Sequence, residues 1–512
     1  MKKSIRGLLL YPPIQFMDVE TPRPDGSLGL LYLASALESQ GIETDLLDAS
    51  VGDSSRSLEQ TFYRNVKQGN GLTRIGMSFD EIAEYVNVGN YDFVGISSNF
   101  TPQTRMVIET AKAIKKISPY VRIYSGGVNA RALKERFLES GLFEGICLSE
   151  GEIIFPRMIE AQAEGKILEN IPGVAFYRNG EVIVNPVDES CFPEKLDDLA
   201  MPAWEKLPFK KYDEIASPHG IDLSVNKFRY APMMTSRGCR FQCAYCHVSG
   251  EKEGIFGPIG KLRYHSIERV VKEAEKLKSL GVKKLFMEDD SLLSDKKKMK
   301  IIIGYFENMG LSLANVNGVN IADFFNRKNG EYEIDKEFIE FLKRARFEQI
   351  VFPVESGSQR ILKKYATNKV LLDRMDVVGL MKIISDQKIL APVNMMIGFP
   401  DEDEKEIQES IDLAKKLKNA GAPYVTFFIP IPFPGSRLYD IAIAEKYLKE
   451  NFNPDLLNWK RAVMENTKVS PKRLEEIRDR ANEEVNSQEH LRKRLENSIG
   501  FRWVSGSTNS VE

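Results

Sequence analysis

Three cysteines crowd into one short stretch of the chain, SRGCRFQCAYCHVSG at residues 236–250. Cys239, Cys243 and Cys246 follow each other with the spacing CxxxCxxC, although the 512 residues contain only five cysteines. Thiolates at this spacing can wrap one small metal centre. The stretch also follows a predicted strand end, where α/β folds place their chemistry. We therefore predict a metal site at this loop.

The number of thiolates narrows the kind of metal centre. A structural zinc site needs four ligands, and His247, next to Cys246, is the nearby residue that could complete one. Cys191 lies far upstream, in a predicted linker. Three thiolates on a cubane iron-sulfur cluster would instead leave one iron open to bind something else. That arrangement favours catalysis over a structural role.

Composition and charge exclude several classes of protein. With 71 basic and 73 acidic residues the net charge is -2, which gives no general reason to expect nucleic acid or an anionic membrane as partner. The first apolar run ends at Tyr11 and is shorter than the apolar core of a signal peptide. No apolar run is long enough to span a membrane. We expect a cytoplasmic protein, where thiols stay reduced, without a membrane or nucleic-acid partner.

A first α/β series, residues 1–165, precedes the cysteine loop. Its five apolar runs each end in a turn-prone segment, and a helical pattern such as Leu30, Leu33, Ala34 and Leu37 separates them. This alternation predicts a Rossmann-like, doubly wound parallel sheet. Ligands of such sheets bind outside the carboxyl ends of the strands, here the turns YPPIQ, SSNFT, SGGVN and SEGE.

A second α/β series, residues 226–445, contains the loop. Six predicted strands with intervening helices indicate a partial (β/α)6 barrel. Ser266 is predicted to cap one helix, and Asp401, with Glu404 reaching back, to cap another. Residues 166–225 are predicted to form a linker region. Residues 446–512 are predicted to form a C-terminal helical region with a disordered tail.

The cysteine motif, with Tyr245 before its last cysteine, resembles that of the radical S-adenosylmethionine (SAM) superfamily. The segments FMEDDSLLSD, VESGSQRILKKY, MMIGFPDEDEKE and PIPFPGSRLYD resemble the SAM pocket of that superfamily. The resemblance implies a 4Fe-4S cluster held by the three cysteines, with SAM on the open iron. It implies SAM contacts by Tyr245, Asp289, Glu355, Ser356, Asn394 and Gly398.

Two of these implied roles are more specific. Glu355 and Ser356 would lie near the ribose or the methionine end of SAM, and Gly398 would let the backbone approach adenine. One departure from the superfamily concerns the third barrel strand. Many relatives carry an arginine there, whereas this chain has Asn317 or Asn320. The residue that neutralises the SAM carboxylate is therefore left open.

The first series resembles the cobalamin-binding domains that are fused ahead of radical SAM domains. The segments YPP, LGLLYLASALESQG, VGISS, SGGVNA and SEGE carry the resemblance. It implies a site for the nucleotide tail of cobalamin at Ser97, Ser98, Gly126, Gly127, Glu150 and Gly151. The motif DxHxxG is absent and all four histidines lie beyond residue 200, so this domain offers no histidine to cobalt. The loops PPIQFMD or SSNFTPQ would shield the lower face of cobalamin.

Together the two resemblances imply a cobalamin-dependent radical SAM methyltransferase that methylates an unactivated carbon of a small molecule. Flavodoxin or ferredoxin would supply electrons. Two alternatives stay open: a cobalamin-binding radical SAM enzyme that does not methylate but performs a cyclisation or ring rearrangement, and a zinc-binding scaffold protein. Cys147 is predicted to be a core residue and Cys191 a linker residue. These two remaining cysteines are too few for the second three-cysteine cluster of a methylthiotransferase.

Overall fold

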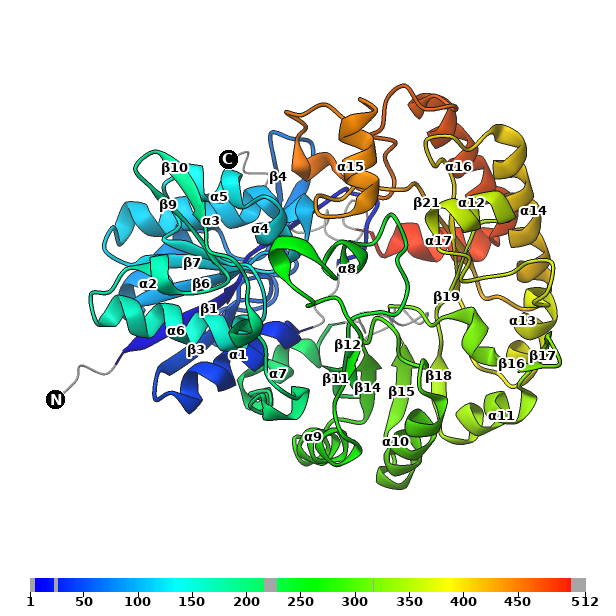
Figure 1. Ribbon diagram of the computed structural model, residues 1–512, viewed down its shortest axis with the longest axis horizontal. Coiled ribbons are helices and arrows are strands. Elements are labelled where there is room, and N and C mark those ends of the chain that lie inside the picture. The colour runs from blue at the N-terminus through cyan, green and yellow to red at the C-terminus, as the bar shows by residue number, and fades with distance from the viewer. Residues whose placement is uncertain (1–4, 23–25, 216–227, 316, 499–512) are drawn as a thin grey trace.

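The computed structural model describes residues 5–22, 26–215, 228–315 and 317–498. Two α/β units lie side by side in it, the first in blue and cyan and the second in green and yellow (Figure 1). The C-terminal helices, in orange and red, lie over the second unit. The predicted class, a doubly wound sheet followed by a partial barrel and C-terminal helices, is confirmed.

The first unit is built on a seven-stranded sheet of order β10-β9-β8-β7-β6-β1-β3. Its five parallel strands wind in the flavodoxin-like order 2-1-3-4-5, so the winding reverses between β1 and β6 and leaves a crevice at their carboxyl ends. The strands are β1 (Arg6–Tyr11), β3 (Glu43–Asp48), β6 (Phe93–Ser97), β7 (Arg122–Gly126) and β8 (Gly145–Cys147). The larger helices are α1 (Leu28–Ser39), α2 (Phe79–Gly89), α3 (Thr104–Ile117) and α6 (Gly151–Ala163).

The first unit extends past residue 165, where the sequence placed its end. Strands β9 (Val174–Arg178) and β10 (Glu181–Val184) come from the predicted linker and add an antiparallel hairpin to β8. Asn179 and Gly180, both with positive φ, make the two-residue turn that this hairpin requires. The hairpin covers the edge of β8, which would otherwise expose unpaired backbone groups.

The second unit contains all six predicted strands. Two parallel sheets, β11-β14-β15-β18 and β19-β20-β21, are joined by a parallel bridge between Gln349 and Leu390. The fourth predicted strand is split into β18 and β19. The strands are β11 (Tyr230–Met233), β14 (Lys284–Met287), β15 (Ser312–Asn315), β18 (Phe347–Gln349), β19 (Phe352–Glu355), β20 (Val393–Met396) and β21 (Val425–Phe428).

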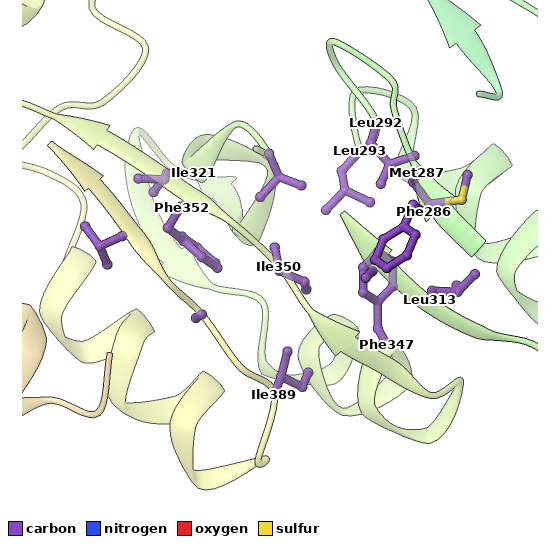
Figure 2. Close-up of a cluster of buried hydrophobic side chains, with 14 of the residues drawn as sticks. Phe286, Met287, Leu292, Leu293, Leu313, Ile321, Phe347, Ile350, Phe352 and Ile389 are labelled. Carbon is purple, nitrogen blue, oxygen red and sulfur yellow. The ribbon is translucent and has the colours of Figure 1, made fainter. Parts of the chain in front are cut away.

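Helices follow the barrel strands and pack on the outside of the barrel (Figure 1). They are α9 (Ile267–Ser279), α10 (Lys296–Met309), α11 (Lys336–Arg344), α12 (Gln359–Tyr365), α13 (Val377–Asp386) and α14 (Glu404–Asn419). Buried apolar side chains link the strands on both sides of the split (Figure 2). Phe286, Leu313 and Phe347 come from the three neighbouring strands β14, β15 and β18, Ile350 lies at the split, and Phe352 comes from β19. This core fixes the strand ends that carry the site.

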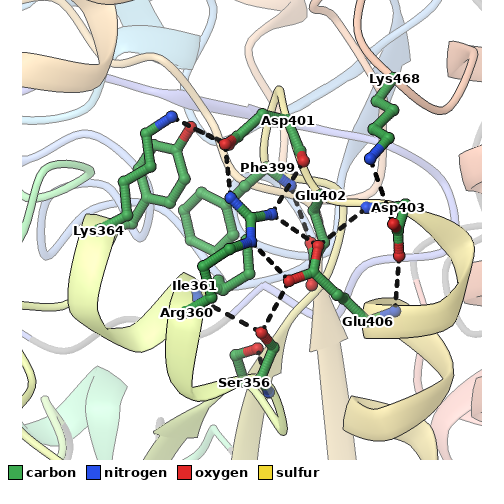
Figure 3. Close-up of polar contacts among 12 residues, drawn as sticks. Ser356, Arg360, Ile361, Lys364, Phe399, Asp401, Glu402, Asp403, Glu406 and Lys468 are labelled. Atoms are coloured by element: carbon green, nitrogen blue, oxygen red, sulfur yellow. Dashed lines mark hydrogen bonds and ion pairs between the residues drawn. The ribbon is translucent and has the colours of Figure 1, made fainter.

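The structure confirms one of the two predicted helix caps and corrects the other. Ser266 caps α9 as predicted, because its hydroxyl accepts a hydrogen bond from the amide of Arg269. The prediction for Asp401 is wrong by two residues: Asp403 caps α14 and forms the capping box with Glu406. Asp401 instead accepts hydrogen bonds from Arg360, Lys364 and Tyr365 (Figure 3). The acids at residues 401–406 allow either Asp401 or Asp403 to cap the helix. Asp403 takes this role because Arg360 and Lys364 of α12 bind Asp401.

Helices α16 (Pro471–Val485) and α17 (Gln488–Glu496) lie in the predicted C-terminal helical region, whereas α15 (Arg437–Ala444) lies within the range predicted for the barrel. The predicted disordered tail lies outside the described residues. Helix α16 packs on β21 and α14. After it, Asn486 makes hydrogen bonds to both backbone groups of Val425 and so covers the free edge of β21. Within the part of the chain that the structure describes, no helix is both long and apolar enough to cross a membrane.

Candidate active site

The cysteine loop leaves the barrel at the end of β11 and is anchored there by a buried carboxylate. Asp289 is fully buried and accepts hydrogen bonds from the backbone and hydroxyl of Thr235 and the hydroxyl of Ser236. Burial raises the pKa of Asp289 to about 6. Asp289 was predicted to contact SAM, and the structure places it beneath the start of the loop. These bonds fix the chain just before Cys239.

The three cysteines of the loop carry free thiols. Cys243 is buried, and Cys239 and Cys246 are partly buried. Burial raises the pKa of the Cys246 thiol to about 12. Within residues 5–22, 26–215, 228–315 and 317–498, no three His, Cys, Asp or Glu side chains converge on a point that could hold one metal ion. Three thiols on one loop at the spacing CxxxCxxC can each bind a separate iron of a cubane. The donor set therefore fits a 4Fe-4S cluster.

A hydrogen-bonded trio joins the cysteine loop to the fourth barrel strand. Tyr245 donates to Oε1 of Glu355 over 2.8 Å, and Lys369 donates to the same oxygen over 2.6 Å. Glu355 has a φ of 73°, a left-handed conformation that is rare for this residue type and is often found at functional sites. Burial disfavours the charged form of Lys369 and acts to lower its pKa. The charges of Glu355 and then Cys243 act in the opposite direction, and the pKa of Lys369 is raised. The trio thus places a cation beside the cluster ligands.

The other residues predicted to contact SAM have varied surroundings. Ser356 is buried and its hydroxyl shares hydrogen bonds with Ser410 and the amide of Ser358. A Cβ at Gly398 would lie 2.1 Å from a methyl carbon of Leu474, and the φ of Gly398 is +94°, so helix α16 and the backbone both require glycine there. Asn394 is partly exposed on β20. SAM contact by these residues stays a prediction.

The third barrel strand carries no arginine, but an arginine reaches its end from elsewhere. Arg240, within the cysteine motif, makes an ion pair with Asp323, which follows β15. Asn320 donates weakly to the same carboxylate, at 3.4 Å, while Asn317 donates to the carbonyl oxygen of Glu288. Two positive charges therefore lie near the cysteine loop. Arg240 belongs to the loop itself, and Lys369 lies in the segment after α12.

A cavity of about 290 Å³ lies at the carboxyl edge of the first sheet, at the lower end of the volumes typical of small-molecule pockets. Glycines and serines, together with larger side chains such as Leu9 and Phe155, line its first-unit side, and residues of the cysteine loop and of α8 (His247–Gly250) line the other. Of the six residues predicted for the cobalamin tail, five line it: Ser97, Gly126, Gly127, Glu150 and Gly151.

Glycine and serine keep this cavity open. A Cβ at Gly127 would lie 2.2 Å from Oδ1 of Asn99 and 2.7 Å from the carbonyl oxygen of Ser98. At Gly126 the nearest atom would be Cβ of Cys147, 3.5 Å away, so a side chain there fits and fills the cavity. Ser98, the sixth predicted residue, is buried and accepts a hydrogen bond from Asn129. The cradle fits a nucleotide tail.

The two loops predicted to shield the lower face of cobalamin are bonded to each other. Gln15 and Gln103 exchange two hydrogen bonds of 2.8 Å between backbone and side chain. Asn99, from the loop after β6, lines the cavity. The loop SSNFTPQ is therefore the better placed of the two for that role.

Buried ion pairs cross from the first unit to the cysteine loop. Glu150, which is 3% exposed, is bound by Arg237 and by Arg263 at 2.5 Å, and Arg237 also binds Glu152 at 2.6 Å. Although burial opposes ionisation, the two guanidinium groups lower the pKa of Glu150. A second pair joins Arg131 to Glu251. Glu150 was predicted to contact cobalamin, and in the structure it ties the two units together.

Sequence reasoning missed several residues of this site. Arg237 and Arg240 flank Cys239, and their charge beside a buried strand end was a usable signal. Lys369 lies more than a hundred residues from the loop, in a segment without a motif, so only the fold could bring it there. Arg263 likewise reaches Glu150 because β13 (Arg263–Tyr264) pairs with β12 (Ser236–Arg237).

Comparison with known proteins agrees with this geometry. The family model of the B12 binding domain matches residues 26–159, and that of the radical SAM superfamily matches residues 233–414. Similar curated proteins include an uncharacterized methyltransferase of Pyrococcus horikoshii, 27% identical over 90% of this chain and 86% of its own. Cytidylyl-2-hydroxyethylphosphonate methyltransferase of Streptomyces wedmorensis is 26% identical over 89% of this chain and 85% of its own.

Solved structures share the fold. TsrM from Kitasatospora setae, a radical SAM methyltransferase with cobalamin and a 4Fe-4S cluster bound, matches with a TM-score of 0.59 at 18% identity, over 86% of this chain and 78% of its own. The cobalamin-dependent SAM radical enzyme OxsB, with aqua-cobalamin and SAM bound, matches with a TM-score of 0.61 at 16% identity, over 100% of this chain and 59% of its own.

These findings define the class of protein. A cobalamin-binding domain precedes a radical SAM domain, and the predicted cofactors are a 4Fe-4S cluster, SAM and cobalamin. In this order of domains the chain is similar to the cobalamin-binding radical SAM enzymes. Two relatives in sequence are named methyltransferases, and TsrM is a radical SAM methyltransferase with cobalamin bound, so the comparisons support cobalamin-dependent radical SAM methylation.

Proposed function

We propose that the protein transfers the methyl group of SAM, by way of cobalamin, to an unactivated carbon atom of a small molecule. One observation carries the proposal: Gly238, His247 and Val248, from the cysteine loop and its helix, line the same cavity as Ser97 and Gly126 of the first sheet. The two cofactor sites therefore share a wall. An enzyme that passes a methyl group to a radical needs this proximity.

The residues of the chain divide this work. When bound, the cluster supplies the electron that cleaves SAM to an adenosyl radical, and cobalamin supplies the methyl group. Cys239, Cys243 and Cys246 hold the iron, and the small residues of the first sheet make room for the nucleotide tail. The buried ion pairs of Glu150 fix the units relative to each other. The surrounding apolar core excludes water, which protects a radical.

We place the substrate at the carboxyl ends of β20 and β21. Met396 and Phe428 pair across these strands and are partly exposed, whereas their neighbours Met395 and Phe427 are buried. Among the proteins compared, one is named for a cytidylyl phosphonate substrate and TsrM was solved with tryptophan as substrate. Both are small molecules. We further propose that the protein works in the cytoplasm with flavodoxin or ferredoxin as reductant.

The test uses holoenzyme prepared without oxygen from cobalamin-supplied cells. It is reduced chemically and given SAM with a labelled methyl group, and the S-adenosylhomocysteine and 5'-deoxyadenosine formed are measured. We expect both products, with 5'-deoxyadenosine lost when all three loop cysteines are changed to Ala. Formation of 5'-deoxyadenosine without any S-adenosylhomocysteine would support the non-methylating alternative instead.

A further inference from the structure

Two cations without a carboxylate partner stand at the rim of the barrel. Lys460 and Arg494 face the same indole ring, with Nζ of Lys460 4.8 Å and Cζ of Arg494 6.0 Å from the ring centre of Trp459. The ammonium group of Lys460 donates to the carbonyl oxygen of Val19. Neither residue forms an ion pair with an acid among the residues that the structure describes.

The indole ring lies at the end of β21, next to the place proposed for the substrate. The rings of Trp459 and Phe428 lie 5.0 Å apart, and the amide of Ile429 donates to the carbonyl oxygen of Trp459. Phe428 pairs in register with Met396, and side chains alternate along a strand, so both residues project from one face of the sheet. Trp459 therefore borders that face, beside the first unit at Val19.

The local charge at this site is positive. Burial lowers the pKa of Lys460 to about 8, and the charges of Arg494 and Arg478 lower it as well, against the opposing effect of Glu20 and Asp479. Burial also lowers the pKa of Arg494, and Arg478 acts in the same direction, while Tyr424 and Glu20 oppose it. The two nearest acids are engaged elsewhere: Glu20 accepts from Asn458 and the amide of Met17, and Asp479 pairs with Arg478. Among the described residues, the three cations Lys460, Arg494 and Arg478 thus outnumber the two acids, Glu20 and Asp479, that act on them.

We propose that Lys460 and Arg494, over the ring of Trp459, bind an oxyanion of the methyl acceptor, that is, a phosphoryl or carboxylate group. Guanidinium presents a planar fork to such groups, and ammonium a point charge. A bound oxyanion would supply negative charge beyond that of the described acids. This inference rests on the proposed function, because it assigns a substrate class to that reaction.

The probe is methylphosphonate, titrated into holoenzyme by calorimetry near pH 7. We expect binding that weakens at least tenfold in Lys460→Met and in Arg494→Met. The matched control is Arg492→Met, because Arg492 lies on the same helix, is exposed and pairs with Glu496; it should leave binding unchanged. No detectable binding to wild type, or equal loss in the control, would overturn the proposal.

A second measurement needs no variant. Wild-type holoenzyme is treated with a trace of acetic anhydride, and the acetylation of each lysine is followed by mass spectrometry. Methylphosphonate should slow the acetylation of Lys460 and leave that of the exposed Lys493 unchanged. Equal rates at Lys460 with and without methylphosphonate would contradict the proposal. Since S-adenosylhomocysteine is measured separately on the same preparation, failure of methyl transfer and failure of this site can be told apart.

Discussion

The two edges at which cofactors are expected are built in opposite ways. At the carboxyl edge of the first sheet, the predicted residues are mostly small and line an open cavity. At the end of the barrel, the predicted residues are larger and bond to protein partners: Tyr245 to Glu355, Ser356 to Ser410, and Asp289 to Thr235. One edge works by leaving space, and the other by holding charged and polar groups in fixed positions.

This difference decides what could be read from the sequence. A glycine or serine at a strand end makes room whatever its neighbours are, so Ser97, Gly126 and Gly127 could be placed from sequence alone. The role of Glu355 depends on Lys369, and that of Glu150 on Arg237 and Arg263. If the two edges are independent, a substitution at one edge should weaken binding of its own cofactor and leave binding at the other edge unchanged.

The largest effect is expected from filling the cavity. In Gly126→Val, the side chain would project toward Cys147 without backbone strain and occupy the space proposed for the cobalamin tail. We expect the corrinoid content of purified protein to fall more than tenfold while iron and sulfide stay at the wild-type level. The contents are measured by absorbance and elemental analysis. Loss of iron together with corrinoid would show that the two edges are not separate.

A smaller effect is expected at the barrel end. Glu355→Gln would weaken the hydrogen bonds from Tyr245 and Lys369 and leave Lys369 without a carboxylate. We expect SAM to bind about tenfold more weakly, which is about 1.4 kcal/mol, with unchanged corrinoid content. Equilibrium dialysis with labelled SAM measures this. The control is Glu348→Gln, on an exposed part of the same strand region, and an equal loss there would remove the special role of Glu355.

Ser97 and Ser98 are adjacent in the chain, but we expect substitutions at the two positions to have different effects. Ser97 lines the cavity, so Ser97→Val should reduce corrinoid binding. Ser98 accepts a hydrogen bond from buried Asn129, so Ser98→Ala should leave corrinoid binding intact and cost about 1 kcal/mol of stability. Corrinoid content and the thermal midpoint Tm distinguish them. The same loss of corrinoid in both variants would refute the division.

The smallest effect concerns a buried acid under the barrel end. Burial raises the pKa of Glu402 to about 8, while the amides of Gly398 and Phe399 donate to its Oε2. Since the folded protein holds this proton more tightly than the unfolded chain, stability should fall as the pH rises from about 4.5 through about 8. Glu402→Gln removes this titration, so the loss of Tm between pH 6 and pH 9 should become smaller. An unchanged pH profile would contradict the assignment.

The fold was predictable because it depends on periodic patterns along the chain. All six barrel strands and the five parallel strands of the first sheet were found in this way. Three features depended on contacts between distant segments and were not found: the hairpin β9–β10 that extends the first sheet, the cap at Asp403, and the ion pairs of Glu150. In each case local sequence allowed two outcomes, and a partner more than thirty residues away or an open sheet edge selected one.

The central claim is that two cofactors lie against one shared wall on a single chain. Electron paramagnetic resonance of the reduced holoenzyme tests it most directly, because the cob(II) form of cobalamin and the reduced cluster both carry an unpaired electron. The account predicts that the cob(II) signal is broadened and relaxes faster in wild type than in the variant with Cys239, Cys243 and Cys246 changed to Ala. Identical cob(II) signals in wild type that carries both cluster and corrinoid and in the variant that carries corrinoid alone would contradict it.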